Sequence, residues 1–143
     1  MREYIKNTSA LTIHKFITLF AMVGLLGSLF FSEVMKLPPC VLCWYQRILL
    51  YPIAILGIVA VYRNDRKFYT YVLPLSVIGL IVSVYHNLLY WEILPESVAP
   101  CIQGISCTTK YFEILGFITI PFMAFVSFAF VTGLAVWSMR KDM

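Results

Sequence analysis

Four long runs of apolar residues, almost free of charge, limit the folds open to this chain. They cover roughly residues 13–31, 41–62, 68–91 and 114–139. An α-helix needs about 20 apolar residues to cross the hydrocarbon core of a bilayer, and each run is long enough. The apolar–polar alternation typical of the strands of a membrane barrel is absent from the sequence. The sequence therefore predicts an all-α membrane protein, a bundle of four transmembrane helices.

The composition also favours a membrane protein. Hydrophobic residues make up 61% of the 143 residues and charged residues 13%, whereas charged residues account for about a quarter of a soluble domain. The net charge of +4 does not indicate nucleic-acid binding, because the basic residues are scattered singly at the ends of apolar runs. We expect one integral membrane domain over residues 1–143. Its first run is interpreted as a retained helix, since no small-x-small cleavage site follows it.

The distribution of basic residues predicts the orientation of the bundle. Four spans place both termini and the turn at 63–67 on one side of the membrane, and the two remaining connections on the other side. Lysine and arginine are concentrated on the first side, with Arg2, Lys6, Lys15, Arg63, Arg66, Lys67, Arg140 and Lys141 against Lys36, Arg47 and Lys110. Because basic residues accumulate in cytoplasmic segments, we expect cytoplasmic termini and two extracytoplasmic loops.

All four cysteines fall in the segments predicted to be extracytoplasmic, where disulfides persist. Cys40 and Cys43 form a Cys-x-x-Cys, and Cys101 and Cys107 form a second pair. A disulfide that closes so short a segment removes little chain entropy and stabilises a fold weakly. The pairs therefore favour thiol chemistry. The alternative is a non-catalytic membrane scaffold whose loops carry structural disulfides.

The residues around the first pair suggest how a thiolate is stabilised. The two prolines at 38–39 suit the entry to a helix, and the free amides and dipole of its first turn would stabilise a thiolate near Cys40. Positions 40, 43 and 47 share one helix face. Arg47 is costly in an apolar run unless it has a partner or a function. We predict that it favours a thiolate at Cys43 and polarises a carbonyl oxygen on a bound ring.

Two further interpretations concern His86 and a metal. His86 lies in the outer part of the third run. A neutral histidine packed between helices is the common case, and a role near a cofactor or in proton transfer is the alternative.

Four cysteines could also hold zinc. However, the second pair has a wider spacing than zinc sites use, and zinc needs reduced thiols outside the cell, so we expect no metal.

The string Cys-Val-Leu-Cys-Trp-Tyr-Gln-Arg at 40–47, with four spans and a second cysteine pair, resembles the DsbB/BdbC family of bacterial membrane disulfide-forming oxidoreductases. The string Phe-Glu-Ile-Leu-Gly at 112–116 with Pro121 is similar to the family's entry to its last span. The resemblance covers essentially the whole chain and implies a location in the bacterial cell membrane. The five residues between Cys101 and Cys107 are similar to the short Gram-positive, BdbC-like form.

The resemblance implies an electron relay. The redox-active disulfides would be Cys40–Cys43 and Cys101–Cys107. A thioredoxin-fold oxidase similar to DsbA or BdbD would form a mixed disulfide with Cys101, and Cys107 would then attack Cys40. Cys43 would pass the electrons to a membrane quinone, menaquinone in preference to ubiquinone, held near Arg47. Each exchange between cysteines in this relay is an attack of a thiolate on a disulfide.

Overall fold

The computed structural model describes residues 1–36, 40–95, 97, 113–114 and 118–143. Four helices make up most of this part of the chain: α1 (Arg2–Leu29), α2 (Val41–Arg63), α3 (Phe68–Tyr90) and α4 (Ile120–Asp142). A short π-helical turn, η1 (Phe30–Val34), extends α1, and β1 (Glu113–Ile114) pairs antiparallel with β2 (Ile118–Thr119). Each helix includes a segment long and apolar enough to cross a membrane. The predicted four-helix membrane fold is confirmed.

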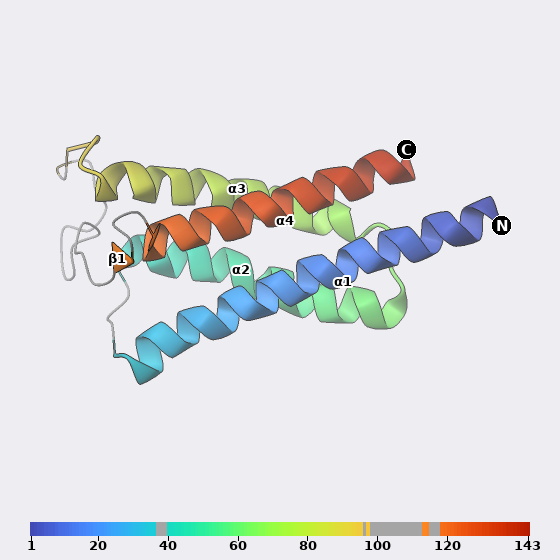
Figure 1. Ribbon diagram of the computed structural model, residues 1–143, viewed down its shortest axis with the longest axis horizontal. Helices are drawn as coiled ribbons and strands as arrows, with labels where there is room; N and C mark the ends of the chain where they lie inside the picture. The colour runs from blue at the N-terminus through green and yellow to red at the C-terminus, as the bar shows by residue number, and fades with distance from the viewer. Residues whose placement is uncertain (37–39, 96, 98–112, 115–117) are drawn as a thin grey trace.

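The helices lie side by side along one axis (Figure 1). Each helix packs mainly against two others, so that α1, α2, α3 and α4 follow one another around a closed ring. Both termini lie at one end of the bundle, and the start of α2, the end of α3 and the β1–β2 hairpin lie at the opposite end (Figure 1). The beginning of α2 therefore faces the end of α3, and this arrangement positions the site described below.

Two helix boundaries differ from the apolar runs in the sequence. The first helix begins at Arg2, well before the run at 13–31, and the last begins at Ile120 rather than at 114. Thr119 has extended backbone and its hydroxyl accepts a hydrogen bond from the amide of Phe122, while Pro121 lies in the first turn. A threonine cap followed by proline is a strong helix start. Before it, β1 and β2 pair antiparallel instead of continuing the helix.

The core is apolar and closely packed. Fully buried side chains of the four helices meet along the axis, among them Ile17, Ile53, Phe68 and Phe128. Many large apolar side chains point outward, such as Phe16, Leu19, Ile48, Ile55, Ile81 and Val126. In water such a surface would aggregate, whereas in a bilayer it contacts lipid tails.

Candidate functional site

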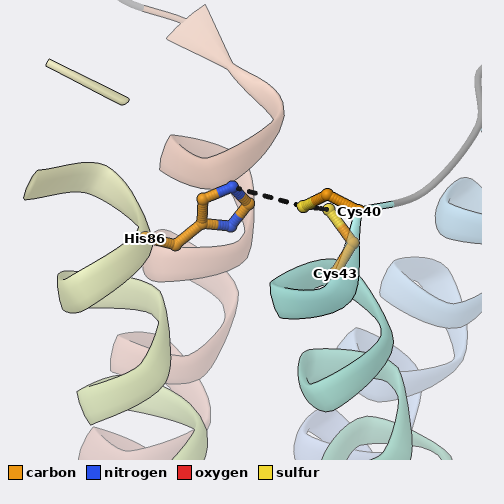
Figure 2. A group of neighbouring side chains, drawn as sticks. All are labelled: Cys40, Cys43 and His86. Carbon is orange, nitrogen blue, oxygen red and sulfur yellow. Dashed lines mark hydrogen bonds between the residues drawn. The ribbon is translucent and has the colours of Figure 1, made fainter. Parts of the chain in front are cut away.

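The first cysteine pair lies where α2 begins. Cys40 precedes the helix with extended backbone (φ −75°, ψ 172°), and Cys43 follows within the first turn. The two Sγ atoms are 3.3 Å apart and both thiols are free. Cys40 is buried and Cys43 is half-buried. The structure thus describes the reduced dithiol, with its sulfurs adjacent and directed toward α3 (Figure 2).

His86 reaches this pair from the last turns of α3 (Figure 2). Its Nε2 lies 3.7 Å from the Sγ of Cys40, and only 2% of its surface is exposed. On the other side of the ring, the Nε2 of Gln46 lies 3.3 Å from the Nδ1 of His86. An amide nitrogen donates, so Nδ1 accepts and the ring proton is on Nε2. In this assignment the imidazole donates a hydrogen bond to the sulfur of Cys40.

The electrostatics of this cluster favour a thiolate at Cys40. The side-chain hydrogen bond with Cys43 lowers the pKa of Cys40 most, burial opposes it, and the hydrogen bond with His86 lowers it further. The position at a helix start acts in the same direction, because free amides and the helix dipole favour a negative charge there. The donors next to the dithiol therefore converge on the first sulfur.

Arg47 links α2 to α1. Its Nε donates to the hydroxyl of Ser28 at 2.7 Å and its Nη2 to the carbonyl of Ser28 at 2.9 Å. Its guanidinium carbon lies 5.4 Å from the centre of the Trp44 ring, which is within the range of a cation–π interaction. Arg47 is buried, whereas 51% of Trp44 is exposed. The sequence predicted that this cation favours a thiolate at Cys43. In the structure the thiolate is favoured at Cys40 instead, and Arg47 bonds Ser28 at the end of α1.

The sequence interpretation covered only part of this cluster. It singled out Cys40, Cys43, Arg47 and His86, and the structure brings the first two and His86 together. It did not identify Gln46, which holds the ring of His86. The helical spacing could have identified Gln46, because position 46 follows Cys43 by three residues and therefore lies on the face next to that cysteine. Cys101 and Cys107 lie outside the described residues.

These features define a class: a four-helix membrane protein with a reduced dithiol, an imidazole and an oriented arginine at one end of the bundle. The family model for the disulfide bond formation protein DsbB matches residues 11–138. The chain therefore belongs to the DsbB disulfide bond formation family. No solved structure matches it significantly.

Individual relatives agree over most of the chain. Disulfide bond formation protein C of Bacillus subtilis is 41% identical over 111 residues, which is 78% of this chain and 80% of the relative. A probable disulfide formation protein of Oceanobacillus iheyensis is 43% identical over 123 residues, or 85% of each chain. A probable disulfide formation protein of Metapseudomonas resinovorans is 36% identical over 124 residues, or 86% of each chain.

Proposed function

We propose that this protein is a membrane thiol–disulfide oxidoreductase that reoxidises an extracytoplasmic thioredoxin-fold oxidase and delivers the electrons to a membrane quinone. The observation that carries the proposal is the reduced Cys40–Cys43 pair at a helix start, with His86 donating toward its first sulfur. The names of the relatives, which describe disulfide formation, support the reaction class. The proposed location is a bacterial cell membrane, with the cysteine loops outside.

The chain's own residues have distinct proposed roles. Cys101 forms the mixed disulfide with the partner and Cys107 attacks the Cys40–Cys43 disulfide at Cys40, which releases Cys43. When the pair is reduced, His86 and the thiol of Cys43 stabilise negative charge on Cys40. Cys40 becomes the leaving group when Cys101, freed from the partner, attacks Cys107 of the Cys40–Cys107 disulfide, and a stabilised thiolate is a good leaving group. Gln46 acts as a positioning residue, because it fixes the ring of His86.

The residues next to Cys43 fit a quinone. A quinone needs a polar group for its carbonyl oxygen, a flat apolar contact and access from lipid. Arg47 offers guanidinium N–H donors in an orientation fixed by Ser28, and the half-exposed ring of Trp44 lies over that cation. Arg47 would bind the carbonyl oxygen and Trp44 would line the ring. A bound quinone supplies oxidising power by accepting two electrons and two protons, and we expect menaquinone.

The test is quinone-dependent oxidation of a reduced thioredoxin-fold protein by the purified chain in detergent. Wild-type protein should oxidise the partner only when a quinone is added, and Cys43→Ser should abolish turnover. His14→Ala is the control, because His14 is equally buried but bonds Ser138 near the termini. Unchanged turnover in Cys43→Ser would reject the proposal. The scaffold alternative predicts that serine replacements lower only the amount of folded protein.

A further inference from the structure

We infer that the reduced dithiol and His86 form a binding site for a thiophilic divalent cation of tetrahedral preference, such as Zn²⁺. Cys40, Cys43 and His86 are a group whose ligand atoms all lie within 4.8 Å of one another. The group is composed of two soft sulfur ligands and one imidazole nitrogen, the donor set that zinc prefers. This site differs from the Cys₄ arrangement considered from the sequence, because it does not use Cys101 or Cys107.

The distances between the ligand atoms suit a tetrahedral ion. Bonds of about 2.3 Å to sulfur and about 2.0 Å to nitrogen place tetrahedral ligand atoms roughly 3.5–3.8 Å apart. The two sulfurs, at 3.3 Å, are slightly closer than this range. The Nε2 of His86 is 3.7 Å from the Sγ of Cys40, and the remaining pair of ligand atoms lies within 4.8 Å. All three side chains point into the same space between α2 and α3 (Figure 2). Small side-chain rotations would complete the geometry, and a fourth position remains for water.

Gln46 makes this histidine suitable both as a donor and as a ligand. In the reduced dithiol its amide nitrogen donates to Nδ1 of His86. A metal on Nε2 requires the ring proton on Nδ1, and the Gln46 amide can turn so that its oxygen accepts that proton. A partner on the second ring nitrogen orients metal-binding histidines generally. Cation binding releases the thiol protons still present and moves the imidazole proton from Nε2 to Nδ1.

The site exists only in the reduced protein. A Cys40–Cys43 disulfide removes both thiolates, so the oxidised pair offers the imidazole alone. A cation held by both thiolates would in turn prevent them from forming a disulfide until it is removed by a chelator. This inference concerns binding and does not depend on the proposed quinone step, so the oxidoreductase function can hold if the metal site fails.

The test uses Co²⁺ as a spectroscopic probe, under anaerobic conditions, on the full chain with Cys101→Ser and Cys107→Ser. The reduced chain should bind one Co²⁺ with thiolate-to-metal absorption and release it on addition of Zn²⁺. His86→Ala should weaken binding at least about tenfold, and Gln46→Ala should weaken it about tenfold, the lower end of the effect of an outer partner. His14→Ala should bind as the parent chain does.

The oxidised form of the same chain is a further control. Its Cys40–Cys43 disulfide leaves no thiolate, so added Co²⁺ should give no thiolate-to-metal absorption. Three results would overturn the inference: no binding by the reduced chain, equal affinity in His86→Ala, or binding that survives oxidation. Thermal unfolding of each variant in its metal-free form shows whether it is folded. If His86→Ala is unfolded, His86→Cys replaces the nitrogen with sulfur and should retain a site with a third thiolate.

Discussion

The sulfur of Cys40 lies within hydrogen-bond distance of the Cys43 sulfur and of the Nε2 of His86, and this arrangement predicts an altered pH dependence on mutation. His86→Ala removes one donor to a charged acceptor, an interaction worth about 1.5–3 kcal/mol, or roughly one to two pKa units. Because His86 lowers the pKa of Cys40, its loss raises that pKa. The thiolate is the reactive form, so the pH midpoint of Cys40 alkylation should move upward by about one unit or more.

The measurement is the rate of iodoacetamide reaction against pH in a chain with Cys43→Ser, Cys101→Ser and Cys107→Ser, which leaves one thiol. The serine hydroxyl at position 43 can still donate to the Cys40 sulfur, so the two compared chains differ only in His86. His14→Ala again serves as the matched histidine control. A profile that does not move in His86→Ala contradicts the role of the imidazole as a donor.

The guanidinium of Arg47 makes two hydrogen bonds to one residue, Ser28, and this predicts that lysine is a poor replacement. A lysine ammonium cannot reproduce the two-pronged contact, although it keeps the charge. Arg47→Lys should raise the KM for quinone about tenfold, corresponding to about 1.4 kcal/mol. Steady-state kinetics with varied quinone measure this effect. Ser28→Ala should give a smaller rise in this KM. Ser32→Ala is the control and should give none, because the Ser32 hydroxyl bonds the carbonyl of Leu29 rather than Arg47.

At the scale of whole elements, the contact between α3 and α4 depends on a residue without a side chain. A Cβ atom added at Gly79 would overlap the ring of Phe128, which is fully buried. Overpacking of this kind costs about 1–3 kcal/mol. Gly79→Ala should therefore lower the thermal unfolding temperature of the protein in detergent.

Another glycine of the same helix pair provides the control for that substitution. A Cβ added at Gly133, in α4, has nothing within 4 Å, so Gly133→Ala should be neutral or slightly stabilising because alanine is the better helix former. Adding Phe128→Leu to Gly79→Ala should restore part of the lost stability, since the smaller side chain makes room. Equal unfolding temperatures for the two alanine variants would show that α3 and α4 do not pack as described.

The helices could be predicted from the sequence because length and apolar character alone determine what crosses a bilayer. The first residue of α4 could not be predicted in this way, because the apolar run continues without a break through Thr119, the residue that caps the helix. The spacing at 40–47 predicted which residues share a face of α2. It could not predict that His86 meets Cys40, because that contact depends on how α2 and α3 are rotated against each other.

The whole molecule has two chemically different ends. At one end are both termini and a set of polar contacts, including the hydrogen bond from Tyr69 to Asp142 and the contact of Lys141 with Ser9. The other end holds the start of α2, the end of α3 and the paired strands β1 and β2 (Figure 1). The dithiol lies at that start of α2 and His86 in the last turns of α3. The proposed electron transfer from a secreted partner requires the dithiol end to face outward. The excess of basic residues at the end with the termini predicts that orientation.

This orientation can be measured by labelling single cysteines in intact cells with a thiol reagent that does not cross membranes. In a chain with its four native cysteines replaced by serine, Ser97→Cys should be labelled, because position 97 is exposed beyond the end of α3. Asn64→Cys, in the exposed turn between α2 and α3, should be labelled only after the cells are lysed. Labelling of both variants in detergent is the control for the reactivity of the two thiols, because each should then react fully. The reverse pattern would place the dithiol in the reducing cytoplasm, where the proposed exchange with a secreted oxidase could not occur.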